Sequence, residues 1–273
     1  MEIGASLARL ELTASDAAAA AAFYARTFKL QVSRDGDAFS CHAPGRELRF
    51  LDGDGGQLHR VSLRFASPSS FDAYRQALIA QRIETVDHAD GAFSVRDPEG
   101  RLVQFLCPAT APSHDEPGYG EHSARLQHFA VRTPDLDALL DFYVNTLHFT
   151  LSDRVLNDEG VVTAAFLRTD EEHHVMAIFR APMSRFDHFS CETPDWGQLR
   201  DWADHMAAVG VDLAWGIGRH GPGNDTFFMV RDADGNMGEI SSDLERCVPG
   251  RPVGQWKHRP QTLNQWGVAL MRC

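Results

Sequence analysis

The sequence consists of two similar halves, and this repeat constrains the fold more than any other feature of the chain. Residues 23–34 read FYARTFKLQVSR, and residues 142–153 read FYVNTLHFTLSD. Near the end of each half, residues 95–105 (VRDPEGRLVQF) and 230–240 (VRDADGNMGEI) both read as a strand, a turn with Asp and Gly, and a second strand. Self-similarity over such a distance indicates that one structural unit occurs twice.

Within each half, strand-like runs alternate with helix-like segments. Alternating runs at 7–12 (LARLEL) and 126–131 (LQHFAV) precede the helices that lead into the FY pairs. Residues 58–83 and 186–211 each read as a strand followed by an amphipathic helix. Each half is therefore expected to contain two βα-type modules with additional strands, in an α+β fold.

A segment rich in Pro, Gly, Ser and charged residues separates the halves. It reads CPATAPSHDEPGYGEHSA at 107–124, a composition typical of a linker. We accordingly expect an N-terminal half, a linker, a C-terminal half and a C-terminal tail, at residues 1–110, 111–124, 125–245 and 246–273.

Composition excludes several classes of function. The formal net charge is −12 and no Lys/Arg-rich run occurs, which argues against nucleic acid and anionic membranes as partners. The five cysteines include no CxxC pair, a usage typical of free thiols in a reducing compartment. The N-terminal segment lacks the basic start and apolar core of a signal peptide, and no apolar run approaches the roughly 20 residues of a membrane span. We expect a cytoplasmic chain.

Three residues far apart in sequence form a candidate metal site. His128, His188 and Glu239 lie in the segments LQHFAV, FDHFSCE and DGNMGEISSD, which read as strands. Two histidines and one carboxylate are the ligand set of non-haem Fe(II) sites with open positions, and the same set also serves zinc hydrolases. A single histidine in an apolar strand is more often a core residue, so the prediction depends on the three together.

The repeat provides an internal comparison for this set. When the halves are aligned on their shared motifs, the first half offers Arg9, Arg60 and Gln104 at the positions of the three candidate ligands. Arginine keeps its charge and has no acceptor atom, so it cannot bind a cation. Because the three positions differ together while the surrounding motifs match, we interpret the first half as a scaffold and the second as the metal-bearing copy.

In these residues the chain resembles the type I extradiol ring-cleavage dioxygenases (catechol 2,3-dioxygenase-like) of the vicinal oxygen chelate, or glyoxalase-like, superfamily. The resemblance runs from about Leu7 to about Gly267 and is most specific at 218–243, GRHGPGNDTFFMVRDADGNMGEISSD. It implies two tandem halves. Each is a pair of βαβββ modules that form a curved, barrel-like mixed sheet with helices outside. It also implies a homo-oligomer.

The resemblance implies a role for several side chains. The metal ligands are the three residues named above, the ion is Fe(II) or else Mn(II), and molecular oxygen is the co-substrate. His220, nineteen positions before Glu239, is the candidate acid–base catalyst, and His173, fifteen before His188, would stabilise charge on oxygen. The candidate substrate-binding residues are Met229, Asp187, Asn224, Phe166 and Trp215.

Two positions depart from the family pattern. Ten positions before Glu239, where the family usually has a tyrosine that hydrogen-bonds a substrate hydroxyl, this chain has Met229. The residue before His188, commonly histidine, is Asp187. Methionine cannot donate a hydrogen bond, and the loss of one to a charged oxygen costs about 1.5–3 kcal/mol. The change is compatible with a slower reaction, a different substrate or a different reaction.

Three classes of function follow from the sequence. The first is an extradiol (meta) dioxygenase that opens a catechol-like diol in aromatic hydrocarbon catabolism. The second is an oxygen-independent isomerase, lyase or hydrolase on the same metal platform, which Met229 and Asp187 favour. The third is a protein that binds a small aromatic compound without turnover. Retention of His173 and His220 argues against the third, because sequestration requires no proton transfer.

Overall fold

The computed structural model describes residues 3–108 and 122–271. The first half forms an eight-stranded sheet within this part of the chain, with two helices, α1 (Ala17–Thr27) and α2 (Pro68–Ala80). Its strands are β1 (Ala5–Ala14), β2 (Gln31–Asp35), β3 (Ala38–Ala43), β4 (Arg46–Asp52), β5 (Gln57–Phe65), β6 (Val86–Asp87), β7 (Phe93–Arg96) and β8 (Leu102–Leu106).

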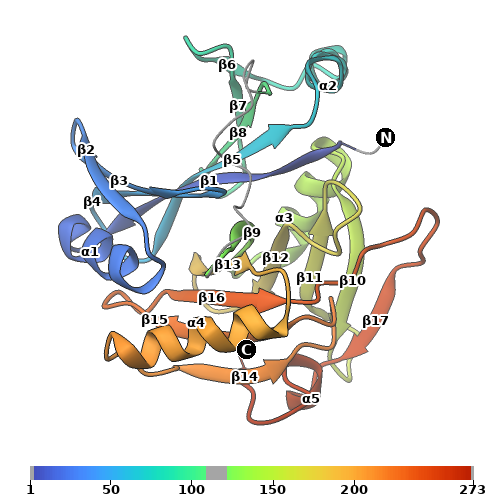
Figure 1. Cartoon of the computed structure of the whole chain (residues 1–273). Helices are drawn as coiled ribbons and strands as arrows, with labels where there is room; N and C mark the ends of the chain where they lie inside the picture. The colour runs from blue at the N-terminus through green and yellow to red at the C-terminus, as the bar shows by residue number, and fades with distance from the viewer. Residues whose placement is uncertain (1–2, 109–121, 272–273) are drawn as a thin grey trace.

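The second half forms a nine-stranded sheet, which lies below the first in Figure 1. Its strands are β9 (Arg125–Thr133), β10 (Thr150–Leu156), β11 (Val162–Arg168), β12 (Met176–Arg180), β13 (Arg185–Glu192), β14 (Trp215–Arg219), β15 (Thr226–Arg231), β16 (Met237–Ser242) and β17 (Gly254–Lys257). The accompanying helical segments are α3 (Leu136–Asp141), the π-helical turn η1 (Phe142–Thr146), α4 (Trp196–Ala208) and α5 (Pro260–Leu263).

The two sheets have the same topology, which confirms the α+β fold of two repeated halves. The strand order is β2-β3-β4-β1-β5-β8-β7-β6 in the first sheet and β10-β11-β12-β9-β13-β16-β15-β14 in the second, where β17 is added beside β10. Strand β17 belongs to the expected C-terminal tail, so the tail is partly built into the second sheet. The expected linker, residues 111–124, lies largely outside the described residues.

Strand register makes the correspondence between the halves specific. The middle strands β5 and β13 carry the equivalent serines Ser62 and Ser190. The residues paired with these serines on the two adjacent strands are Arg9 and Gln104 in the first sheet, and His128 and Glu239 in the second. The alignment of the sequence motifs therefore matches residues that occupy equivalent places in the two sheets.

The two faces of the second sheet have different environments. On β9, β15 and β16 successive residues alternate between the main core and a smaller apolar cluster, as expected for strands with a period of two. Helix α4 packs on β15 and β16, while α3 packs on β11 and β12. The smaller cluster surrounds a cavity on the opposite face, and the candidate metal ligands lie there.

The halves pack directly against each other through α1. The Tyr24 hydroxyl donates to Asp232 Oδ2 at 3.0 Å, and its ring lies 5.3 Å from that of Phe189 on β13. Both Tyr24 and Phe189 are fully buried. The first half therefore supports the outer face of the strands that carry the ligands.

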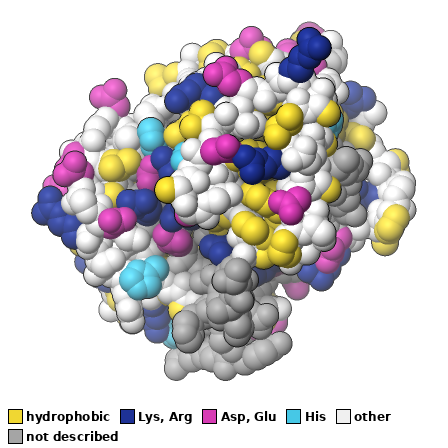
Figure 2. Space-filling model, turned by 90° about the horizontal axis from the view of Figure 1, so that it is seen from above, with side chains coloured by type: hydrophobic (Ala, Val, Ile, Leu, Met, Phe, Trp, Pro, Cys, Tyr) yellow, Lys and Arg dark blue, Asp and Glu magenta, His cyan; other side chains and the backbone are white. Residues whose placement is uncertain are grey.

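The surface seen from above Figure 1 carries charges of both signs. Lys and Arg side chains are interspersed with Asp and Glu across this face, without a continuous basic patch among the residues coloured there (Figure 2). None of the helices in the described residues is long and apolar enough to span a bilayer.

Candidate metal centre

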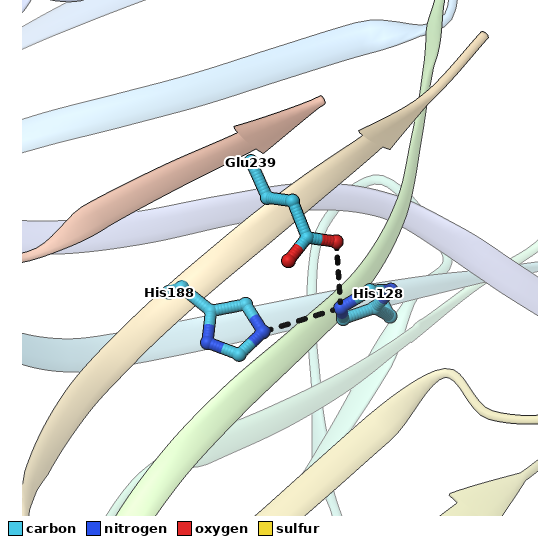
Figure 3. A group of neighbouring side chains, drawn as sticks. All are labelled: His128, His188 and Glu239. Atoms are coloured by element: carbon cyan, nitrogen blue, oxygen red, sulfur yellow. Dashed lines mark hydrogen bonds and ion pairs between the residues drawn. The ribbon is translucent and has the colours of Figure 1, made fainter. Parts of the chain in front are cut away.

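His128, His188 and Glu239 come together on three adjacent strands, β9, β13 and β16 (Figure 3). The Nε2 atoms of the two histidines lie 3.2 Å apart, and His128 Nε2 lies 3.7 Å from Glu239 Oε1. One ligand atom from each residue lies within 4.8 Å of those of the other two. The three donor atoms therefore face one common space.

The environment of Glu239 fits a bound cation. Its side chain is fully buried, and neither carboxylate oxygen has a hydrogen-bond partner among the described residues. A buried carboxylate without donors is unfavourable unless a cation compensates its charge. Two imidazole nitrogens and one carboxylate suit a divalent transition metal. The donor set and the unpartnered oxygens therefore both indicate a bound cation.

The residue before each histidine ligand fixes its tautomer. His128 Nδ1 donates to Gln127 Oε1 and His188 Nδ1 donates to Asp187 Oδ1, each at 2.6 Å. Asp187 Oδ2 in turn accepts from Arg132 Nε at 2.5 Å. Because the proton of each imidazole is held on Nδ1, the lone pair of Nε2 is directed at the common space, the arrangement that metal-binding histidines require.

Two β-bulges position these supporting residues. Gln127 on β9 and Asp187 on β13 are the extra, unpaired residues where the register of the β9–β13 pair shifts. Bulges re-aim side chains and are common beside active sites. The first sheet has bulges at the equivalent residues, Ala8 and His59, so the irregularity belongs to the repeated unit. Only the second half places hydrogen-bond acceptors behind two histidines.

Burial and charge set the protonation of the ligands. Burial lowers the pKa of His128 to about 3, so this imidazole is neutral at physiological pH. Burial alone would raise the pKa of Glu239, but His220 and the two histidine ligands outweigh it and lower that pKa. The site therefore presents a neutral imidazole at His128 and an ionised carboxylate at Glu239.

A narrow cavity opens onto the ligands. Beside His128 and His188 it is lined by Phe166, His174, Ala177, Phe179, Trp215, His220, Pro222, Met229 and Leu263. A wider hollow between the halves is lined by Lys29, Arg46 and Arg125 among others. It contains none of the three ligands, so the narrow cavity is the relevant one.

His220 lies in the cavity, as the sequence led us to expect. Its Nδ1 donates to the Leu263 carbonyl at 2.5 Å, and its Nε2 lies 3.6 Å from Glu239 Oε2. The ring stacks on Phe227 with centroids 3.8 Å apart and planes 8° from parallel. Burial opposes its protonation, but the carboxylates of Asp225 and Glu239 outweigh this and raise the pKa of His220.

The position of His173 differs from the expectation. Its ring is buried outside the cavity lining, with Nε2 3.2 Å from Asp153 Oδ2. The neighbouring His174 lines the cavity, and its ring centroid lies 4.4 Å from that of His128. The two histidines lie in irregular chain just before β12 with their Nδ1 atoms 3.1 Å apart, and only His174 is among the described residues that line the cavity. Spacing in the sequence did not distinguish the two.

The candidate substrate-binding residues divide into two groups. Phe166, Trp215 and Met229 line the cavity. Asp187 does not, because its carboxylate lies behind His188 between that ring and Arg132. Asn224 is also absent from the lining, and its Oδ1 accepts from Arg219 Nε at 3.3 Å.

The sequence analysis did not identify several residues of the site. Ala177 and Phe179 are alternate residues of β12, a pattern visible only once the strand is assigned to this sheet. Leu263 comes from α5, and nothing in its local sequence indicates that it reaches the cavity. Asp225, fully buried, has no hydrogen-bond partner for either carboxylate oxygen among the described residues, and burial raises its pKa to about 7.

Sequence comparisons identify relatives of this arrangement. Residues 125–240 match the model of the Glyoxalase/Bleomycin resistance protein/Dioxygenase superfamily. Metapyrocatechase 2 of Cupriavidus necator is 28% identical over 267 residues, covering 88% of this chain and 82% of the relative. The 3-methylcatechol 2,3-dioxygenase of Pseudomonas putida is 31% identical over 144 residues, covering 48% of each chain.

Solved structures share the whole fold. A Mn(II)-bound glyoxalase from Novosphingobium aromaticivorans superposes with a TM-score of 0.80 at 22% identity, covering 98% of this chain and 92% of that one. Homoprotocatechuate 2,3-dioxygenase from Brevibacterium fuscum, in complex with 3,4-dihydroxyphenylacetate, gives a TM-score of 0.80 at 23% identity, covering 97% and 89%. At this identity the likeness establishes the fold, which is the vicinal oxygen chelate fold.

Proposed function

We propose that this chain, a member of the vicinal oxygen chelate superfamily, is an extradiol dioxygenase that opens a catechol-like ring with molecular oxygen. The relatives named for ring cleavage support a metal-dependent oxidoreductase acting on an aromatic diol. The observation that carries the proposal is the convergence, within 4.8 Å of one another, of two imidazole nitrogens and the unpartnered carboxylate of Glu239, beside the cavity that both histidines line.

The metal ligands in this proposal are His128, His188 and Glu239, and the ion is Fe(II), with Mn(II) as the alternative. Such an ion, when bound, lowers the pKa of a diol hydroxyl and supplies oxygen chemistry that side chains alone cannot perform. The protein contributes preorganisation, because Gln127 and Asp187 hold both imidazoles with Nε2 free.

His220 is the proposed acid–base group. Its Nδ1 proton is committed to the Leu263 carbonyl, so the neutral ring offers Nε2 as a proton acceptor toward the cavity. Stacking on Phe227 keeps the ring in this orientation. We infer that Nε2 accepts a proton from a substrate hydroxyl and returns it to the ring-opened product.

His174 takes the role that the sequence suggested for His173. Burial lowers the pKa of His174 well below its usual value, so the ring stays neutral. It faces the cavity beside His128, where a neutral imidazole can stabilise charge that develops on oxygen. His173 contacts it from behind, with the two Nδ1 atoms 3.1 Å apart.

The test is oxygen consumption by the reconstituted protein. Metal-free chain is loaded with Fe(II) anaerobically, then mixed with air and a panel of catechols while oxygen and near-visible absorbance are recorded. We expect iron-dependent uptake with a yellow product, lost in His188→Ala. Arg60→Ala, the matched change at the equivalent position of the first half, should retain activity.

An oxygen-independent reaction on the same metal site is the second candidate. Met229 favours it, because the cavity has no phenol at the place where the related dioxygenases are expected to have one. Tight metal binding with no oxygen uptake on any diol would reject the dioxygenase proposal in favour of this alternative.

A further inference from the structure

We propose that the cavity selects diols whose ring substituent is uncharged and apolar, such as alkyl or halogen, and excludes those that carry a carboxylate. The inference rests on the proposed function, because it assumes that a catechol binds at the three ligands. It follows from the walls of the cavity, from the cost of burying a charged substituent there and from the partners of two nearby arginines.

The walls are apolar apart from the histidines. Besides four histidines, the described lining residues are Phe166, Ala177, Phe179, Trp215, Pro222, Met229 and Leu263. The one polar atom among these side chains, Trp215 Nε1, donates to the Val268 carbonyl at 2.7 Å. A substituent directed away from the metal ligands therefore meets hydrocarbon, aromatic faces and a thioether.

Two arginines that pair with carboxylates behind the site are committed there. Arg132 donates to Asp187, and Arg251 donates to Asp153 and Glu245. Neither they nor any other Lys or Arg occur among the described residues that line the cavity. A substrate carboxylate would have no ion-pair partner there, and burial of an unpaired carboxylate is strongly disfavoured.

Desolvation adds to this exclusion. A carboxylate substituent would lose its hydration on entry into the narrow cavity, whose lining is largely apolar. An alkyl or halogen substituent brings no charge and gains from burial against the apolar wall.

Binding of size-matched ligands tests the inference without depending on turnover. The 273-residue chain, loaded with Mn(II) and kept anaerobic, is titrated calorimetrically with 4-ethylcatechol and 3,4-dihydroxybenzoate. A second pair, 3-ethylcatechol and 2,3-dihydroxybenzoate, carries the substituent next to the diol. Unsubstituted catechol is the reference. We expect each ethyl compound to bind at least about 100-fold more tightly than its carboxylate counterpart.

A variant tests whether the lack of a cation in the cavity wall causes the preference for uncharged substituents. Leu263 lies at the cavity on a short helix near the end of the chain and is 9% exposed. Leu263→Lys should reduce the preference by about 10-fold or more, because a cation would then face the substituent. Leu263→Met should keep it. Circular dichroism and metal stoichiometry verify that both variants are folded.

The outcomes separate this inference from the proposed reaction. Equal or tighter binding of the carboxylated diols to the wild-type chain would overturn the inference, whatever reaction the enzyme catalyses. An unchanged preference in folded Leu263→Lys would overturn it too. If the ethyl compounds bind preferentially but no diol consumes oxygen with Fe(II), the dioxygenase proposal fails and the selectivity stands.

Discussion

At the scale of single residues, Asp225 is a buried side chain whose ionisation affects the stability of the metal-free protein. Its carboxyl is fully buried without a hydrogen-bond partner in the described structure, and burial raises its pKa from 3.8 to about 7 although His220 opposes the shift. Between about pH 4 and 7 the folded chain therefore holds a proton that the unfolded chain has released. Because the folded chain binds the extra proton, the free energy of unfolding decreases as the pH rises through this window.

Replacement of Asp225 by Asn should remove this dependence. In chelator-treated protein, Asp225→Asn should gain stability relative to wild type as the pH rises from 4.5 to 7.5, by up to a few kcal/mol. Urea unfolding at several pH values measures the difference, and Asp243→Asn, at a half-exposed carboxylate, is the control. Parallel stability curves for Asp225→Asn and wild type would contradict a raised pKa at this position.

At the scale of the strand pair β9–β13, the candidate metal centre depends on two bulges that both halves possess. The bulge residues are Ala8 and His59 in the first sheet and Gln127 and Asp187 in the second. In the second sheet both bulge residues accept hydrogen bonds from the imidazoles that follow them. The repeated unit thus supplies the backbone geometry, and Gln127, His128, Asp187 and His188, together with Glu239 on β16, convert it into a candidate metal site.

Asp187→Asn should weaken metal binding while the fold remains intact. A neutral amide polarises the His188 imidazole less than a carboxylate does, and loss of such support typically costs about 10–100-fold in affinity. Competition with a chromophoric chelator measures the affinity. His59→Asn, at the equivalent bulge of the first half, should leave it unchanged. Equal affinities for Asp187→Asn and wild type would show that the carboxylate does not support the ligand.

At the scale of the whole molecule, the first half supports the strand that carries the carboxylate ligand. A Cβ atom added at Gly238, next to Glu239 on β16, would lie 2.7 Å from the ring of Phe28, just after α1. Phe28 also packs on Phe189 of β13, with ring centroids 5.0 Å apart. The first half therefore contributes the packing surface behind the candidate site.

Gly238→Ala should disturb both stability and metal affinity. The added methyl group overlaps a fully buried aromatic ring, which typically costs about 1–3 kcal/mol and displaces the strand beside Glu239. The double variant Phe28→Leu/Gly238→Ala should recover part of both losses, because the smaller side chain makes room. Urea unfolding and chelator competition test this; a double variant with fully additive losses would refute direct contact as the cause.

Sequence was sufficient to predict the α+β repeat and to select the three candidate ligands, because strand periodicity and motif spacing are local properties that the repeat duplicates. It could not decide between His173 and His174, since both lie in irregular chain before β12, where no strand period indicates which ring reaches the cavity. It also assigned Asp187 to the substrate, although a bulge turns that side chain behind His188. Leu263 joins the site only through tertiary packing of α5.

The central claim, oxygen-dependent ring cleavage, is tested most directly by isotope incorporation. The Fe(II)-loaded chain is supplied with ¹⁸O₂ and a bound apolar catechol, and the product is analysed by mass spectrometry before its aldehyde oxygen exchanges with water. We expect a ring-opened product that contains both labelled oxygen atoms. A product without label, or one formed equally well under nitrogen, would contradict this claim and indicate an oxygen-independent reaction at the same metal centre.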